Sequence, residues 1–326
     1  MNQITALLIL CTFFVSYICQ SQPSAYPTLN EQRAPLFARK LIKPTRLLDS
    51  IKIVSDLTFL SSEICEGRKP GTPGHERAAQ RILSRMRTIG LDSFDNSLIA
   101  PFTGRTINGT TAGKNLIGFI KGTKNEKDFL VVSAHYDHVG KTAGITFFGA
   151  DDNASGVACM LAMANYFKKN PPPYSIIFAA FDREETGLEG AMKYVDQLEK
   201  TNRLAGIKMN LNLDMVARSD SNELYVCGIK HNPSYKYVVE EVKHKTNALL
   251  LMGHDFGSFR NDWTKLSDQY AFHKKNIPFL YVSVEDHADY HKPTDTVERI
   301  NLGRFIENCN TILLIAKAIK LKSGGK

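Results

Sequence analysis

The chain has 326 residues, of which 43% are hydrophobic and 23% are charged. This balance excludes a disordered or fibrous chain and is typical of a globular protein with a buried core. The net charge of +8 is not accompanied by a basic patch interleaved with aromatic residues, so it indicates a solvated surface and no nucleic-acid partner.

The N-terminal segment differs from the rest of the chain. Residues 1–21 carry no charged side chain and contain an apolar run too short to span a bilayer comfortably. Small residues near its end favour cleavage after Ser21, so we expect a signal peptide and an exported protein, periplasmic or secreted. An uncleaved N-terminal membrane anchor is the alternative, and after signal removal no stable membrane insertion is expected. Residues 22–48 are polar and contain several prolines, which predicts a linker or an N-terminal arm before the main domain at 49–326.

Helical and extended patterns alternate along the remaining sequence. Apolar residues at helical spacing predict helices at 49–60, 76–89, 155–169, 187–197 and 302–321. Apolar runs predict strands at 115–121, 129–134, 174–181, 207–213, 224–228 and 278–284. A segment rich in Gly and Pro, 67–74, predicts a loop. The alternation indicates an α/β fold: a single three-layer domain whose mixed, mostly parallel β-sheet is covered by helices on both faces.

Polar side chains follow the C-terminal ends of several predicted strands, where such folds place their active sites. Others open the helix at 155–169 or lie in the loop after the last predicted strand. Because these segments meet at one edge of the sheet, their side chains are expected to form one site. The candidates are His135, Asp151, Glu184, Glu185, Asp214 and His291.

The types of these side chains indicate metal-assisted hydrolysis. Imidazole and carboxylate ligands without a thiolate suit zinc or another borderline divalent ion in a catalytic role. A carboxylate shared by two ions allows a pair about 3.5–4 Å apart, which can stabilise both the attacking and the departing oxygen. Of the neighbours Glu184 and Glu185, one can face a metal and the other can take a proton from water. Asp137, two residues after His135, is expected to orient that imidazole.

Each candidate taken alone also has an ordinary structural interpretation. A Glu-Glu pair is commonly a solvated helix start, paired aspartates before a helix can cap it, and a histidine after a strand is commonly a hydrogen-bonded structural residue. The occurrence of all of them at strand ends favours one site. His138 and His287 border it and are weaker candidates for substrate contacts. The remaining histidines are expected to be structural or on the surface: His75, His231, His244, His254 and His273.

Five short motifs contain the candidate residues. They are His-Tyr-Asp at 135–137, Gly-Ala-Asp-Asp-Asn-Ala-Ser-Gly at 149–156, Arg-Glu-Glu-Thr-Gly at 183–187, Asn-Leu-Asp-Met at 212–215 and Asp-Tyr-His-Lys-Pro-Thr-Asp-Thr at 289–296. With these motifs, the chain from about residue 49 to the C-terminus resembles the co-catalytic dizinc aminopeptidases. That family includes bacterial leucyl aminopeptidases and aminopeptidase Y, with glutamate carboxypeptidase and glutaminyl cyclase as relatives.

The resemblance implies two Zn²⁺ ions and removal of N-terminal residues from peptides with a free N-terminus, by attack of a hydroxide held between the ions. Asp151 would be the bridging carboxylate, joined to Asp152 by a cis peptide bond. Glu184 would be the general base and later the proton donor to the leaving amine. One ion would be held by His135 and Asp214, and the other by Glu185 and His291.

Several alternatives stay open at this point. Relatives of this type carry Asp-His where this chain has Asp268-Gln269, which leaves local packing or substrate contacts undetermined. Carboxypeptidase or aminoacylase activity, glutaminyl cyclisation with a single zinc, and a non-catalytic binding module are the other functions that the same fold supports. The side chain preferred at the cleavage point and the oligomeric state are not determined by the sequence.

Overall fold

The computed structural model describes residues 28–33, 41–43, 46–106, 109–219, 221–257 and 261–321. The segment expected to be a signal peptide lies outside these residues. Within them, no helix is long and apolar enough to cross a membrane.

Helices and strands largely alternate from residue 156 onward, as the sequence predicted, whereas several strands follow one another between residues 92 and 146. The helices are α1 (Leu29–Arg33), α2 (Ser50–Leu60), α3 (Pro73–Ile89), α4 (Gly156–Lys169), α5 (Glu189–Lys200), α6 (Lys236–Val242), α7 (Gln269–His273) and α8 (Leu302–Ala318). The strands are β1 (Asp92–Ser93), β2 (Ile99–Thr106), β3 (Gly109–Ile120), β4 (Asn125–His135), β5 (Lys141–Thr142), β6 (Ile145–Thr146), β7 (Tyr174–Phe181), β8 (Ile207–Leu213), β9 (Glu223–Cys227), β10 (Leu249–Met252) and β11 (Phe279–Ser283).

One mixed sheet forms the centre of the fold, with strand order β1-β3-β7-β4-β8-β11-β9-β10 and β2 paired to β3. The central strands β7, β4, β8 and β11 are parallel to one another. β3 is antiparallel to β7, and β9 is antiparallel to β11, so the direction changes on both sides of this parallel centre. The C-terminal ends of four neighbouring strands therefore meet at one edge of the sheet.

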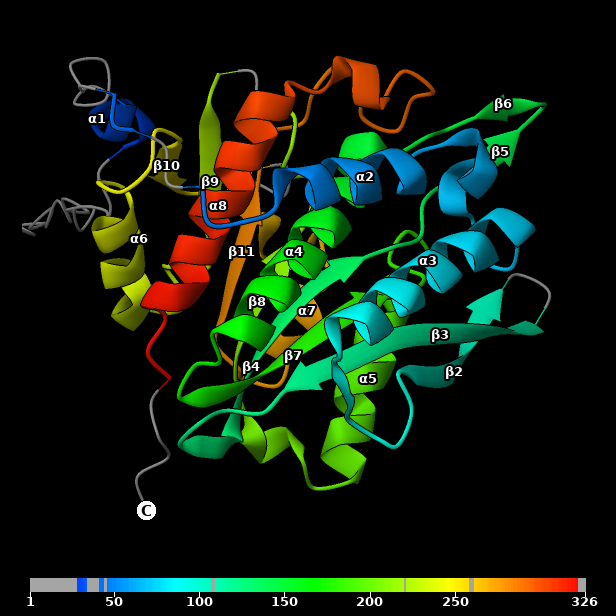
Figure 1. Cartoon of the computed structure of the whole chain (residues 1–326), viewed down its shortest axis with the longest axis horizontal. Helices are drawn as coiled ribbons and strands as arrows, with labels where there is room; N and C mark the ends of the chain where they lie inside the picture. Colours follow the sequence, from blue (N-terminus) through cyan, green and yellow to red (C-terminus); the bar gives the residue numbers. More distant parts are fainter. Residues whose placement is uncertain are drawn as a thin grey trace, which may run out of the picture.

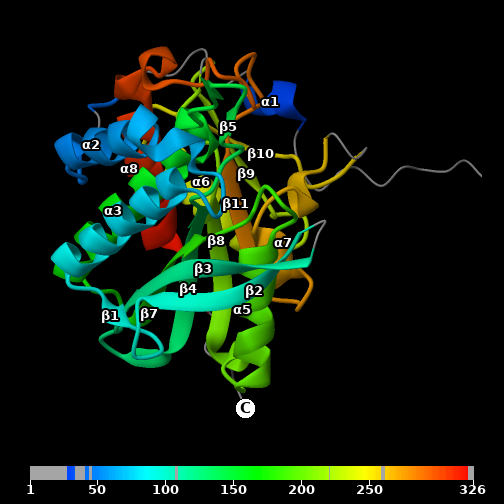
Figure 2. The same ribbon diagram turned by 90° about the vertical axis from the view of Figure 1, so that its right-hand side faces the viewer.

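Helices cover both faces of this sheet (Figures 1 and 2). α2, α3, α4 and α8 lie on one face, and α5 and α7 lie on the other. The alternating side chains of β4 show how the two layers are separated: Leu130 and Val132 pack in the core under α4, whereas Val131 packs in the core under α5. The predicted single-domain α/β class is confirmed.

The apolar strands agree with the sequence pattern most closely. Every residue of β7 is buried, which explains its continuous apolar run, and its bounds are those predicted. The helix predicted at 76–89 begins earlier, at Pro73, because the Thr72 side chain accepts a hydrogen bond from the His75 N–H and caps it. It ends at Gly90, whose φ of 77° allows the left-handed turn. The loop predicted at 67–74 therefore ends inside this helix.

Part of the expected N-terminal arm lies against the sheet. The Gln32 side-chain amide exchanges hydrogen bonds of 2.9 and 2.8 Å with the backbone of Met252 in β10. Arg33 forms an ion pair of 2.5 Å with Glu223 at the start of β9. At the described residues Gln32 and Arg33, these contacts support the proposal of an N-terminal arm that packs on the domain.

We expect Leu130→Ala to lower the free energy of unfolding by about 2–5 kcal/mol, because it leaves a cavity beside a fully buried position of the central sheet. Urea unfolding followed by circular dichroism measures this loss. Ile51→Ala is the matched control, because the Ile51 side chain on α2 is 81% exposed and its truncation should change stability by less than about 0.5 kcal/mol. Equal losses in the two variants would contradict the packing described here.

Candidate metal centre

A first group of possible metal ligands lies where β4 and β8 end. His135 is the last residue of β4, and Asp214 follows β8 directly. The His135 Nε2 atom lies 3.1 Å from Asp214 Oδ1 and 3.4 Å from Asp152 Oδ1. These three buried side chains present their ligand atoms within 4.8 Å of one another.

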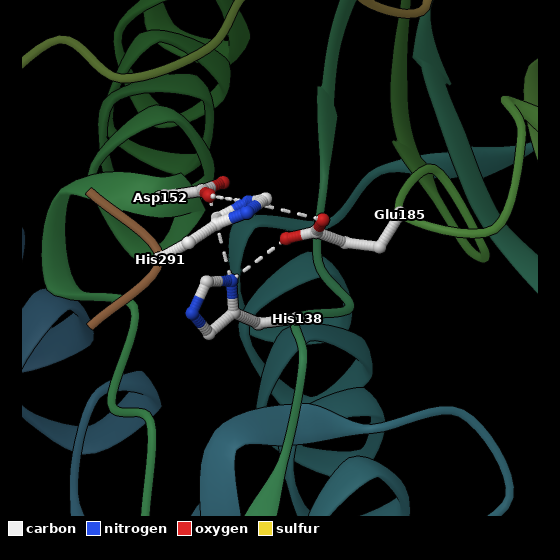
Figure 3. Close-up of side chains that lie close together, drawn as sticks. All are labelled: His138, Asp152, Glu185 and His291. Atoms are coloured by element: carbon white, nitrogen blue, oxygen red, sulfur yellow. Dashed lines mark hydrogen bonds and ion pairs between the residues drawn. The ribbon is translucent and has the colours of Figure 1, made fainter. Parts of the chain in front are cut away.

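A second group lies beside the first and is shown in Figure 3. The His291 Nε2 atom lies 3.0 Å from Asp152 Oδ2 and 3.2 Å from Glu185 Oε2. The His138 Nδ1 atom lies 2.8 Å from Glu185 Oε1 and 3.5 Å from Asp152 Oδ2. Four side chains from four segments of the chain thus converge on one point: His138, Asp152, Glu185 and His291.

Asp152 belongs to both groups, whereas the expected bridging residue was Asp151. Oδ1 of Asp152 faces His135, and Oδ2 faces His138 and His291. This places one carboxylate between the two groups. The cis peptide bond in this turn joins Asp152 to Asn153, one residue later than the resemblance implied.

The Asp151 side chain points instead toward the segment after Asp214. It accepts hydrogen bonds from the backbone N–H of Ala217 (2.7 Å) and Arg218 (3.2 Å), and from the Ser155 hydroxyl (3.0 Å). Consecutive side chains of an irregular turn point in different directions, so an Asp-Asp pair can supply one ligand and one backbone acceptor. The Oδ2 atom of Asp151 also lies 3.3 Å from the Nε2 atom of His287, and all these partners lie outside both ligand groups.

Asp137 contacts the site in two ways. Its backbone carbonyl oxygen lies 3.2 Å from His135 Nδ1, and its carboxylate lies farther away, at 3.7 Å. The same carboxylate accepts hydrogen bonds from the backbone N–H groups of Glu184 (3.0 Å) and Glu185 (3.3 Å). Asp137 therefore connects the end of β4 to the loop that carries both glutamates.

Glu184 lies next to the first group but outside both. Its Oε2 atom is 4.0 Å from His135 Nε2, and its side chain is mostly buried. Burial raises the pKa of Glu184 well above its usual range, and the neighbouring carboxylates of Asp214 and Asp268 raise it further, against the effect of His135. A carboxyl group with a raised pKa beside possible ligands, without contacting them closely, is suited to accept a proton.

The acidic residue Asp295 holds the loop of His291 against the turn of Asp152. The Asp295 carboxylate accepts hydrogen bonds from the backbone N–H groups of Asp151 (3.0 Å) and Asp152 (3.2 Å). Tyr290 stacks on the His291 ring with centroids 4.0 Å apart. His291 and the shared carboxylate are therefore fixed relative to each other, although 139 positions separate them in the sequence.

The chemistry of the two groups fits divalent cations. Hydrogen bonds to Asp152 and Glu185 raise the pKa of His291 to about 10, which reflects concentrated negative charge around this ring. Buried carboxylates this close together are costly unless cations neutralise them. The donor atoms are imidazole nitrogens and carboxylate oxygens, the set that zinc uses in catalytic sites. The described residues of both groups can thus hold metal ions.

The Asp268-Gln269 pair lies beneath this site. The Gln269 side chain accepts a hydrogen bond of 2.9 Å from Asn212 and donates one of 2.8 Å to the carbonyl oxygen of Trp263, so it packs inside the domain. Asp268 is fully buried, and its carboxylate has no hydrogen-bond partner among the described residues. Burial raises the pKa of Asp268, which favours the neutral carboxylic acid.

Comparison with known proteins agrees with this site. An α/β fold with histidines and carboxylates gathered at strand ends is typical of metal-dependent enzymes. Residues 115–316, which include all the site residues, match the family described as "Peptidase family M28". The chain belongs to this peptidase family, and the expected relation to the zinc aminopeptidases is confirmed.

Individual relatives show the same relation. The chain is 35% identical to aminopeptidase YwaD of Bacillus subtilis over 201 residues, which cover 59% of this chain and 41% of that protein. The zinc aminopeptidase BSAP from Bacillus subtilis has a similar fold, with a TM-score of 0.67 at 22% identity, covering 88% of this chain and 98% of that one. A glutaminyl cyclase from Fimbriiglobus ruber gives a TM-score of 0.69 at 21% identity, covering 86% and 100%. The match to the curated aminopeptidase thus spans about two fifths of its length.

The structure brings together four of the five expected ligands: His135, Glu185, Asp214 and His291. It adds Asp152 and His138, to which the sequence interpretation did not assign a metal-binding role. The sequence could have indicated Asp152, because either member of the acidic pair at 151–152 can serve as a metal ligand. His138 lies only three residues after His135, and this spacing at the end of a strand was the available signal.

Proposed function

We propose that this protein is a dizinc exopeptidase that removes N-terminal residues from peptides. The observation that supports it most strongly is the position of Asp152, whose two carboxylate oxygens face different ligand groups. His135 and Asp214 would complete the first ion's ligands. Glu185 and His291, with His138, would hold the second. A shared carboxylate of this kind is what a close pair of ions requires.

The two groups differ in the number of ligands they offer. The first has three protein ligands, a number that leaves a position open for water or substrate in catalytic zinc sites. The second has four, which closes a tetrahedral site. We assign the reaction to the side of His135, where Glu184 also lies. Zinc bound there would lower the pKa of a water molecule and polarise the scissile carbonyl.

Glu184 is assigned the roles of general base and acid. Its carboxylate would take a proton from the attacking water and later deliver it to the leaving amine. Asp137 supports this role, because its carboxylate holds the backbone of Glu184 and Glu185 in place. The proposal for these two residues is unchanged from the sequence interpretation, except that Asp137 acts on the glutamate loop as well as on His135.

The charge of the site favours the N-terminal end of a peptide over its C-terminal end. Beyond the proposed ligands, the exposed Asp286 adds a carboxyl group beside the site, and it lies close enough to His291 and Asp152 to interact with their charges. A cationic α-amine is attracted to such a surface, whereas a C-terminal carboxylate is repelled. This observation supports an aminopeptidase over a carboxypeptidase.

We expect the purified protein to bind two zinc ions per chain and to hydrolyse aminoacyl peptides. Blocked aminoacyl peptides should be poor substrates, and a chelator should abolish turnover that added zinc restores. Metal analysis with a substrate panel, including peptides with N-terminal glutamine, measures both properties. One zinc per chain with cyclisation of the glutamine peptides would support a glutaminyl cyclase instead, and release of C-terminal residues would support a carboxypeptidase.

We also propose that the protein is exported, because residues 1–21 are uncharged and largely apolar. N-terminal sequencing of the mature protein tests this proposal. A first residue at position 22 supports it, whereas retention of Met1 on a cytoplasmic protein contradicts it.

A further inference from the structure

Arg68 is a fully buried arginine whose five N–H groups all bind backbone carbonyl oxygens. Nε donates to Tyr136 at 3.0 Å. One terminal nitrogen donates to Leu60 and Phe148, at 2.7 and 2.8 Å. The other donates to Gly149 and Asp152, at 2.8 and 3.0 Å. Arginine has five such donors, so its hydrogen-bonding capacity is used completely.

These acceptors belong to the backbone of the metal centre. Tyr136 lies between His135 and Asp137, and Gly149 and Asp152 bracket the turn that carries the shared carboxylate. The carbonyl oxygen of Arg68 in turn accepts a hydrogen bond of 3.2 Å from the backbone N–H of His138. Arg68 therefore connects the segment after β4 to the turn of Asp152, and these two segments carry ligands of both groups.

The local backbone leads the guanidinium into this position. Glu66, Gly67 and Arg68 all have positive φ, and a Cβ on Gly67 would collide with the carbonyl oxygens of Gly140 and Phe147. A Cβ on Gly149 would come within 2.7 Å of an Arg68 terminal nitrogen. Two glycines thus leave room for the loop and for its guanidinium.

The partners of Arg68 are unusual for a buried cation. No carboxylate of the described residues lies within ion-pair distance of its guanidinium, although Asp137, Asp152 and Asp295 are near enough to interact with its charge. A buried charge costs free energy unless hydrogen bonds and opposite charge compensate it. Here the carbonyl groups supply the hydrogen bonds, and the acidic metal centre supplies the opposite charge.

We propose that Arg68 is a positioning residue of the metal centre, which holds the turn of Asp152 and the segment of His135 and His138 in their ligand geometry before any ion binds. This inference rests on the proposed two-metal function. Without the guanidinium, the carbonyl oxygens of Gly149 and Asp152 would lie close together in a buried space with no donor between them. The turn would then relax, and the shared carboxylate would leave its position between the two groups.

The first test is Arg68→Lys, which keeps the charge but offers three donors where five carbonyl oxygens are arranged. We expect the affinity for Zn²⁺ to fall about 10–100-fold, as for other residues that orient metal ligands. Competition with a chelating dye measures this affinity without any peptide substrate. The visible spectrum of the Co²⁺-loaded variant should also change, and kcat for aminoacyl peptides should fall more than KM rises.

Arg85→Lys is the matched control, because Arg85 is also a largely buried arginine but pairs with Asp56, between α2 and α3. We expect this variant to lose stability while keeping the wild-type Zn²⁺ affinity and Co²⁺ spectrum. If Arg68→Lys behaves in the same way, with lower stability and unchanged metal affinity, the role of Arg68 is structural only and the proposal is overturned.

A second variant, Arg68→Gly, leaves space for a free guanidinium ion. Added guanidinium, below denaturing concentrations, should restore Zn²⁺ affinity, whereas methylammonium should not. Wild-type affinity in this variant without guanidinium would also overturn the proposal. A wild-type protein that binds fewer than two ions would instead contradict the proposed function, and the comparison between variants separates these two failures.

Discussion

Glu184→Gln is expected to lower kcat by about 10²–10⁴-fold while both zinc ions remain bound, because the amide cannot accept the proton from water. Glu184 lies outside both ligand groups, 4.0 Å from His135 Nε2, so its replacement leaves the ligands unchanged. The measurement is kcat for an aminoacyl peptide, together with the zinc content of the variant.

Glu298→Gln is the matched control for this experiment. Glu298 is an exposed glutamate of the same size, outside the site, and its replacement should change neither turnover nor metal content. Near-normal turnover in Glu184→Gln would remove Glu184 from its assigned role. A loss of zinc in the same variant would show that Glu184 is a ligand, which would assign the base to another residue.

The second large effect is expected from Asp152→Asn, and the neighbouring substitution Asp151→Asn serves as the comparison. Asp152→Asn should weaken metal binding at both groups, and peptide hydrolysis should fall with it. The loss of affinity should exceed about 10–100-fold, which is the loss expected when a residue that only orients a metal ligand is replaced. The reason is that an amide has a single oxygen, whereas the carboxylate directs one oxygen to each group. Zinc titration and turnover are the measurements.

Asp151→Asn should have a different outcome. This variant should keep both ions and should lose about 1–3 kcal/mol of unfolding free energy, because an amide nitrogen would face the backbone N–H of Ala217 or Arg218. Urea unfolding compares the two variants. Loss of metal in Asp151→Asn with retention in Asp152→Asn would return the bridging role to Asp151 and would falsify the assignment made here.

Three residues outside the ligand groups organise the backbone of the site. Asp137 holds the glutamate loop, Asp295 holds the turn of Asp152, and Arg68 holds that turn and the segment after β4. Each acts mainly on backbone groups and not on the ligand atoms. A site that is organised in this way should have its geometry before the ions arrive, which lowers the cost of ordering the ligands when they bind.

Much of the fold could be predicted from the sequence, because burial leaves a direct pattern in it. The run at 174–181 is apolar at every position since β7 is buried on both faces, and its bounds agreed with the prediction. Elements near the sheet edges, such as β2 and α6, were not predicted. Their positions depend on neighbouring elements more than on their own periodicity.

For the site, the sequence by itself determined the segments and the chemical types. His135, Glu185, Asp214 and His291 could be found because parallel strands place their C-terminal ends at one edge, so strand position alone predicts which polar residues meet. Only the tertiary structure shows that Asp152, and not Asp151, faces both ligand groups, and only it placed His138 and Arg68. The physical reason is that these outcomes depend on the direction of single side chains within irregular turns. Backbone hydrogen bonds from distant segments set those directions, and no local sequence pattern records them.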